Sequence, residues 1–177
     1  MAVDAVITTP RLWLRPHAPE DAAFMVELSH NSQVTRYTGD GPLSLADAQA
    51  ILASLQEQYA TQRAGRFMVV ERATGATLGF AGCKWDHDLN SFDLGYRLAP
   101  HAWGRGLATE AAAACVHYGW TVLGVDQLVA QVMEGNVASQ RVLHKLGFLR
   151  APQLGPEIWR CVRAAAPGDG GGPTVAP

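Results

Sequence analysis

The stretch Gly95-Tyr-Arg-Leu-Ala-Pro-His-Ala-Trp-Gly-Arg-Gly-Leu-Ala-Thr-Glu110 joins a strand pattern to a glycine-rich turn and then to an alanine-rich helix. The first amides of a helix have no partners inside it, and the helix dipole places partial positive charge beside them. Gly104 and Gly106 carry no Cβ atom, so an anion can approach the main chain closely. The stretch therefore predicts an anion site made of backbone N–H groups, with Arg105 nearby.

The flanking residues predict a succession of short strands and helices. Alternating apolar residues predict strands, and apolar residues three or four apart predict helices. Ser44 and Asp47 are typical of a capping box, and Gly147 of a helix end. Strands are expected over 6–15, 67–71, 77–85, 92–98, 128–132 and 157–162, and helices near 19–28, from 44, and over 106–123 and 136–146. This order predicts an α+β (mixed α/β) domain built on one sheet.

Composition narrows the class of protein. A chain of 177 residues, with 48% apolar and 17% charged side chains, fits one globular domain. We expect that domain to cover 1–165, followed by a disordered tail of Gly, Pro and Ala over 166–177. The net charge of −2 argues against binding to nucleic acid. The start of the chain has no basic segment and no long apolar run, so we expect no membrane partner and a cytoplasmic monomer or homodimer.

Cysteines and histidines give no sign of a metal site. The three cysteines are widely spaced and form no paired pattern, which also argues against a disulfide framework. The histidines His101, His117 and His144 do not have metal-ligand spacing. We therefore expect no bound metal.

Two interpretations of the glycine-rich stretch come from the residues alone. One is an ordinary tight turn before a helix. The other is a dinucleotide-binding loop, but Thr109 stands where the third glycine belongs, and Asp126 precedes its apolar run instead of ending it. A Walker-type loop is excluded because no Gly-Lys-Ser/Thr follows.

A third interpretation rests on resemblance. Trp103-Gly-Arg-Gly-Leu-Ala108 resembles the Gln/Arg-x-x-Gly-x-Gly/Ala signature of the GNAT acetyltransferase superfamily, although Trp103 replaces the Gln or Arg. Its branch of RimJ/RimL-like ribosomal-protein N-terminal acetyltransferases is indicated by further matches, in chain order: Thr9-Pro-Arg-Leu-Trp-Leu-Arg15, Gly95-Tyr-Arg-Leu98, Trp103–Ala111 and Asn136-Val-Ala-Ser-Gln-Arg-Val-Leu-His-Lys-Leu-Gly-Phe148. The resemblance spans about 10–163. It implies a mostly antiparallel twisted sheet with a splayed strand pair and helices on both faces.

The resemblance also implies acetyl-coenzyme A as co-substrate and assigns residues to it. Backbone groups at the end of the splayed strand should pair with the pantetheine arm, and the turn amides should hold the pyrophosphate. Asn136 should contact the coenzyme from the later strand–helix turn. The implied residues are Tyr96, Arg97 and Leu98 for the arm, and Gly104, Arg105, Gly106, Leu107, Ala108 and Thr109 for the pyrophosphate.

The reaction that the resemblance implies is direct attack of a neutral amine on the thioester. A lysine amine has a pKa of about 10.4 and an α-amino group one of about 8, so a protein N-terminus needs little help from a base. The amide of Leu98 is the candidate donor to the oxyanion. For the leaving thiolate, much of the superfamily uses a tyrosine where Leu143 stands, whereas RimL-like proteins use a serine, here Ser139. Ser139 is also consistent with a simple helix-capping role.

Asp93 is the candidate general base, and the alternative is an ordinary solvent-facing strand residue. Glu71, Glu110 and His87 are weaker candidates, and Glu110 suits a helix N-terminus.

The acceptor amine, a peptide N-terminus or a small molecule, should meet the loop over 37–42. Tyr37, Asp40 and Trp85 are the candidate lining residues, and Asp40 is suited to a cationic amine. Tyr37 and Trp85 are also consistent with ordinary aromatics at the edge of the core.

Three functions therefore compete: an N-acetyltransferase, an acyl-coenzyme A-binding or sensing module without turnover, and a generic nucleotide-phosphate binder. The tyrosine missing at Leu143 favours the second.

Overall fold

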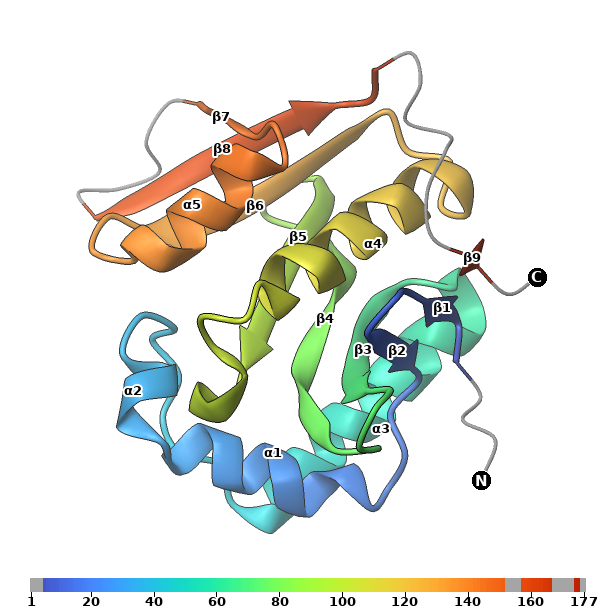
Figure 1. The fold of residues 1–177 in the computed structure, drawn as a ribbon, viewed down its shortest axis with the longest axis vertical. Helices are drawn as coiled ribbons and strands as arrows, with labels where there is room; N and C mark the ends of the chain where they lie inside the picture. Colours follow the sequence, from blue (N-terminus) through green and yellow to red (C-terminus); the bar gives the residue numbers. More distant parts are fainter. Residues whose placement is uncertain (1–4, 152–156, 167–173, 176–177) are drawn as a thin grey trace.

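The computed structural model describes residues 5–151, 157–166 and 174–175. Within them, nine strands form one sheet in the order β7-β8-β6-β5-β4-β3-β2-β1-β9 (Figure 1). The strands are β1 (Ile7–Thr8), β2 (Leu12–Arg15), β3 (Gly65–Glu71), β4 (Thr77–Asp86), β5 (Ser91–Leu98), β6 (Gln127–Met133), β7 (Leu149–Arg150), β8 (Ile158–Ala164) and β9 (Thr174–Val175). The helices are α1 (Asp21–His30), α2 (Ser32–Thr35), α3 (Leu45–Gln62), α4 (Leu107–Thr121) and α5 (Val137–Lys145), with a 3₁₀ turn η1 (Pro100–Ala102).

The sheet is antiparallel except where β5 meets β6. Those two strands are parallel, and their only register pair among the described residues is Asp93↔Val129. The carboxyl-terminal half of β5, from Leu94 to Leu98, therefore has no strand partner on the β6 side. The prediction of a mostly antiparallel sheet with a splayed pair is confirmed.

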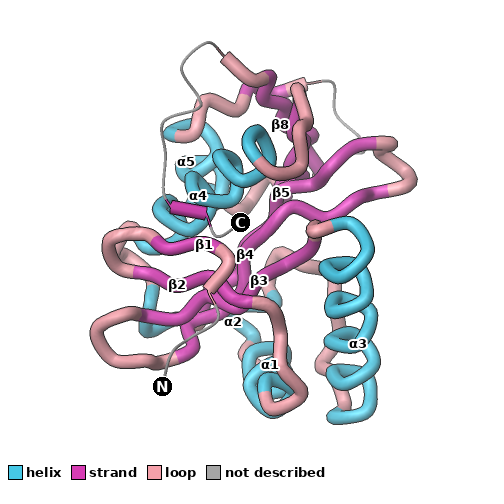
Figure 2. The backbone as a smooth tube through the Cα atoms, turned by 90° about the vertical axis from the view of Figure 1, so that its right-hand side faces the viewer, coloured by secondary structure: helices cyan, strands magenta, loops and turns pink. Residues whose placement is uncertain are grey.

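Helices cover both faces of the sheet (Figures 1 and 2). On one face α4 lies close to β4 and β5, because its inward positions are small: Ala111, Ala112 and Ala114 are essentially fully buried. On the other face α1 and α3 pack together through Met25 and Leu52. The expected capping box starts α3, with Ser44 and Asp47 bonding reciprocally.

The amino-terminal segment corrects one expectation. The predicted single strand over 6–15 is instead two antiparallel strands, with Ile7 opposite Leu14. Pro10 has no N–H to give to a ladder, and the Thr9 hydroxyl accepts the N–H of Leu12 at 2.9 Å, so the chain turns there. The short helix α2 was also not predicted, because four residues give too little periodicity.

Most of the predicted tail over 166–177 lies outside the described residues. In the part that is described, Thr174 and Val175 form β9, which pairs with β1 at the end of the sheet.

Candidate active site

Two cavities meet at the carboxyl-terminal half of β5. The first, of about 750 Å³, lies between the end of β5 and the first turns of α4 and α5, and we call it the α4–α5 cavity. The second, of about 860 Å³, lies on the face covered by α1 and α3, and we call it the α1–α3 cavity. Both are lined by the same six residues at their junction: Tyr37, Thr38, Tyr96, Arg97, Asn136 and Ser139.

The glycine-rich turn borders the α4–α5 cavity. Gly104 and Gly106 have φ values of 71° and 76°, a region that L side chains rarely adopt, and Gly106 is the N-cap of α4. Among the bonds between described residues, none uses the N–H groups from Gly104 to Thr109. These amides are therefore free to bind a ligand, as the sequence predicts for an anion site.

The amino-terminal hairpin holds the turn through hydrogen bonds to Glu110 and to the carbonyl of Arg105. Glu110 accepts bonds from the Thr9 hydroxyl at 2.6 Å and from Arg11 Nε at 2.6 Å. Arg11 Nη1 in turn donates to the carbonyl of Arg105 at 2.8 Å. These charge-assisted bonds, with burial opposing them, keep the pKa of Glu110 below its usual value. We call this set of contacts the hairpin latch.

Positive charge collects in the α4–α5 cavity. Arg36, Arg97, Arg141 and Lys145 line it, and no carboxylate does so among the described residues. Arg141 and Lys145 lie four residues apart on α5 and so share one helix face. None of Arg36, Arg141 and Lys145 was among the predicted site residues, although the basic i, i+4 pair after Asn136 is a signal in the sequence.

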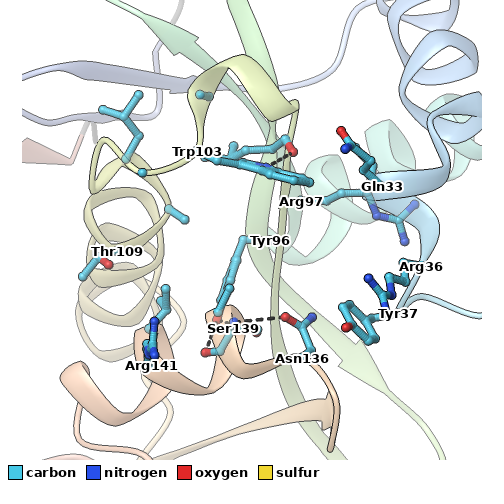
Figure 3. Close-up of a pocket in the computed structure, with 18 of the residues that line it drawn as sticks. Gln33, Arg36, Tyr37, Tyr96, Arg97, Trp103, Thr109, Asn136, Ser139 and Arg141 are labelled. Carbon is cyan, nitrogen blue, oxygen red and sulfur yellow. Dashed lines mark hydrogen bonds between the residues drawn. The ribbon is translucent and has the colours of Figure 1, made fainter.

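At the junction, Asn136, Ser139 and Tyr96 form a connected group (Figure 3). Asn136 caps α5 by accepting the N–H of Ser139 at 3.1 Å. The Ser139 hydroxyl is therefore not the cap, and it lies 2.8 Å from the Tyr96 hydroxyl, which also reaches the Ser139 carbonyl at 3.1 Å. Burial raises the pKa of Tyr96 to about 12, against the opposing hydrogen bond from Ser139, so this phenol is protonated at neutral pH.

Trp103 stands beside this group. Its indole N–H donates to the carbonyl of Leu98 at 2.7 Å, and the residue is 47% exposed over the α4–α5 cavity. The large ring at the first signature position therefore ties the turn to the end of β5.

Asp93 is a buried residue, not the solvent-facing one considered as the alternative. Its carboxylate pairs with Arg66 Nη2 at 2.5 Å, and Arg66 Nη1 donates to the Asp93 carbonyl at 2.6 Å. The guanidinium lies across Gly82 and Gly95, where any added Cβ would collide with Gly65 and with Arg66 itself. Asp93 lines the α1–α3 cavity through this bridge.

Two of the three predicted acceptor residues line a cavity, and the third does not. Tyr37 and Asp40 line the α1–α3 cavity, and Asp40 forms an ion pair with Arg97 at 2.5 Å. Trp85 lines neither cavity, because it packs edge-to-face on Phe92 near the tip of the β4–β5 hairpin.

The remaining candidates lie outside both cavities. Arg105 turns away from the α4–α5 cavity to pair with Glu71, which also accepts from Thr74. The hydrogen bond from Thr74 and, to a smaller extent, the one from Arg105 lower the pKa of Glu71. His87 packs against Trp85. The structure thus brings together the other predicted coenzyme residues and Ser139, but not Arg105, Glu71, Glu110 or His87.

Comparison with known proteins agrees with this geometry. Residues 11–149 match the family described as the acetyltransferase (GNAT) domain. The chain belongs to the GNAT acetyltransferases. This GNAT chain is 31% identical over 147 residues, 81% of its length, to the uncharacterized N-acetyltransferase YoaA of Bacillus subtilis, of which it covers 82%. It is 30% identical over 136 residues to the spermidine N(1)-acetyltransferase of Escherichia coli, covering 76% of this chain and 71% of that protein.

Solved structures share the fold. An acetyltransferase from Agrobacterium tumefaciens superposes with a TM-score of 0.80 at 24% identity, covering 93% of this chain and 96% of the other. A putative ribosomal-protein-serine acetyltransferase from Vibrio cholerae gives 0.74 at 22% identity, over 93% and 100%. A spermidine N-acetyltransferase from Vibrio cholerae, in complex with CoA and spermine, gives 0.72 at 19% identity, over 88% and 96%. The family match and the N-acetyltransferase relatives show that the GNAT chain is an acetyl-CoA-dependent acyltransferase.

No group of three or more potential metal ligands occurs in the described part of the chain. No helix there is long and apolar enough to cross a membrane. Cys83, Cys115 and Cys161 are buried free thiols.

Proposed function

We propose that this protein transfers the acetyl group of acetyl-CoA to a primary amine, with the coenzyme in the α4–α5 cavity and the amine in the α1–α3 cavity. The observation that carries the proposal is the row of unused amides from Gly104 to Thr109 beside a cavity whose charged lining is entirely basic. Free N–H groups at a helix start and several cations are what a pyrophosphate needs.

The unpartnered edge of β5 suits the pantetheine arm. From Tyr96 to Leu98 the backbone has no strand partner toward β6. Its polar groups on that edge, apart from the Leu98 carbonyl that accepts the Trp103 indole, can therefore pair with the amides of the arm. An arm lying there would bring the thioester to the junction of the two cavities, next to Ser139 and Tyr96. Asn136 would adjoin the arm from the start of α5.

The chemistry follows from this placement. The amine nitrogen attacks the carbonyl carbon of the thioester, and the main-chain amide near Leu98 donates to the oxyanion. When the carbon–sulfur bond breaks, the sulfur leaves with the electron pair and needs a hydrogen-bond donor. Ser139 supplies that donor, and the protonated Tyr96 phenol behind it orients the Ser139 hydroxyl.

The amine also loses a proton in the reaction. Asp93 lines the α1–α3 cavity and is the candidate acceptor for that proton, through intervening water because it lies three residues along β5 from Tyr96. Its bridge to Arg66 fixes the side chain on the sheet face beside Gly95. An N-terminal α-amino group would need less assistance than a lysine-type amine because its pKa is about 8. Both a peptide N-terminus and a small amine remain acceptor classes for this site.

Thiol release from acetyl-CoA, measured with a broad amine panel, tests the proposal. Acceptor-dependent thiol release is expected in the unaltered protein. In Gly106→Asp it should disappear along with coenzyme binding, because a carboxylate would stand where the pyrophosphate belongs and φ is unfavourable there. Micromolar acetyl-CoA affinity in that variant would refute the assigned cradle.

An acyl-CoA-binding module without turnover is the second candidate. One observation favours it: Leu143, at the position of the superfamily's tyrosine, is buried and carries no acid. Saturable acetyl-CoA binding without thiol release to any amine would support that module. A generic nucleotide-phosphate binder would instead be stabilised by ADP as strongly as by acetyl-CoA in a heat-shift assay.

A further inference from the structure

The α1–α3 cavity carries an imbalance of charge that bears on the acceptor. Its lining contains three cations, Arg66, Lys84 and Arg97, and two carboxylates, Asp40 and Asp93. Each carboxylate already has an arginine partner at 2.5 Å. Lys84 has no hydrogen bond or ion pair among the described residues, and it is half-buried. The cavity therefore offers one unpaired positive charge and no unpaired negative one.

This imbalance does not depend on the ion pairs staying closed. Asp40 is 55% exposed, so its bridge to Arg97 is weak and can open. Opening would free the Arg97 cation along with the Asp40 carboxylate, and the summed charge of the lining would remain positive. Glu134 and Glu157 adjoin the lining residues Met133 and Ile158, but neither lines the cavity.

The geometry points to an acceptor whose amine is separated by an apolar spacer from an anionic group, with Lys84 as the residue that recognises the anion. The inference rests on the proposed function, because it takes the α1–α3 cavity as the acceptor site. A polyamine, whose second group is cationic, would meet the unpaired lysine instead of a carboxylate.

The spacer length follows from the sheet register. Lys84 lies opposite Asp93, and Ala81 lies opposite Tyr96, beside which the thioester is proposed to lie. Three residues along a strand span about 10 Å, and a lysine stem directed toward the junction shortens that gap to about 6–8 Å. Five methylene groups between amine and carboxylate cover such a distance. The lining of the cavity also includes the apolar residues Met25, Leu43 and Phe80, which suit an apolar chain.

Three amines of equal length test the inference: 6-aminohexanoate, hexylamine and 1,6-diaminohexane. The expected order of kcat/KM in thiol release is anion, then neutral, then cation, with about tenfold between the first and last. The diamine has two equivalent amines, so a twofold statistical advantage works against the predicted order. Lys84→Met should remove the preference, and Lys84→Glu should reverse it. Arg63→Met, which removes a cation from the exposed end of α3, should leave the order unchanged.

A binding measurement keeps the test independent of turnover. With CoA present, hexanoate should raise the melting temperature of the unaltered protein more than hexylammonium does, and Lys84→Glu should invert this. Equal or better use of the diamine, or an order that Lys84→Glu does not change, would overturn the inference while leaving the transferase proposal standing. Absence of thiol release with every amine, combined with the predicted hexanoate shift, would instead reject the transferase and retain the anion subsite.

Discussion

Replacing Tyr96 with Phe tests the junction of the two cavities directly. The change removes one hydroxyl and two contacts, 2.8 Å to the Ser139 hydroxyl and 3.1 Å to the Ser139 carbonyl. At about 0.5–1.5 kcal/mol for each hydrogen bond, the free energy of unfolding should fall by about 1–3 kcal/mol. If Tyr96 orients the donor to the leaving thiolate, kcat should also fall about tenfold, which is about 1.4 kcal/mol in the barrier.

Two comparisons separate catalysis from stability in this experiment. Tyr118→Phe is the matched control, because the Tyr118 hydroxyl is likewise hydrogen-bonded, to the Arg63 carbonyl at 2.6 Å, but lies outside both cavities. It should lower stability in urea denaturation without changing kcat. Since Tyr96 acts through Ser139, the double variant with Ser139→Ala should be no slower than Ser139→Ala alone. Two results would refute the idea that Tyr96 acts through Ser139. One is an unchanged kcat in Tyr96→Phe, and the other is a loss of kcat in the double variant equal to the product of the two single losses.

The other predictions concern charge. Replacing Arg141 and Lys145 with Ala should raise the KM for acetyl-CoA about tenfold and flatten its dependence on salt. Thiol release measured from about 50 to 300 mM salt, over which the Debye length falls from about 14 to about 6 Å, checks this, and an unchanged KM would remove both residues from the site. Arg66→Leu should lower the free energy of unfolding by about 3–5 kcal/mol in denaturant titration, because it leaves Asp93 buried and unpaired. Adding Asp93→Leu to that variant should restore most of the lost stability. If it does not, loss of the ion pair is not the cause of the destabilisation. Burial lowers the pKa of His17 to about 4, so the unfolded chain binds the extra proton between about pH 6.5 and 4. Stability should be fully present above pH 6.5 and fall by about 3 kcal/mol through that window, and His17→Leu should abolish this part of the acid sensitivity, as followed by unfolding at each pH.

Much of the site was predictable because its parts are local in sequence. The free amides, the two positive-φ glycines and the start of α4 all lie within one stretch, so short-range geometry was enough. Asn136 and Ser139 lie one helical turn apart for the same reason. The contact between Ser139 and Tyr96 joins two segments 43 residues apart. It depends on how α5 packs against the splayed end of β5, which no pattern in the sequence states.

The errors have a common physical origin. The strand pattern leaves a solvent-facing Asp93 open because it does not reveal what covers the polar face. The covering group, Arg66, comes from another strand across two glycines. The ion pair of Asp40 with Arg97 could not be read from the sequence either, because the two residues lie 57 positions apart, and the role of Asp40 toward the acceptor stays a prediction. The strand over 6–15 was too long because Pro10 and the Thr9 side chain act on the backbone and not on the hydrophobic alternation.

The hairpin latch has a consequence for how the molecule becomes competent. Thr9 and Arg11 hold Arg105 and Glu110, about a hundred residues later in the chain. The anion cradle is thus preorganised before any ligand arrives, so little loop entropy remains to be lost on association. It also means that the cradle takes its shape only after the amino-terminal hairpin has packed against the start of α4. Coenzyme binding would then require this long-range contact, and a chain whose first hairpin is undocked would lack the ordered cradle.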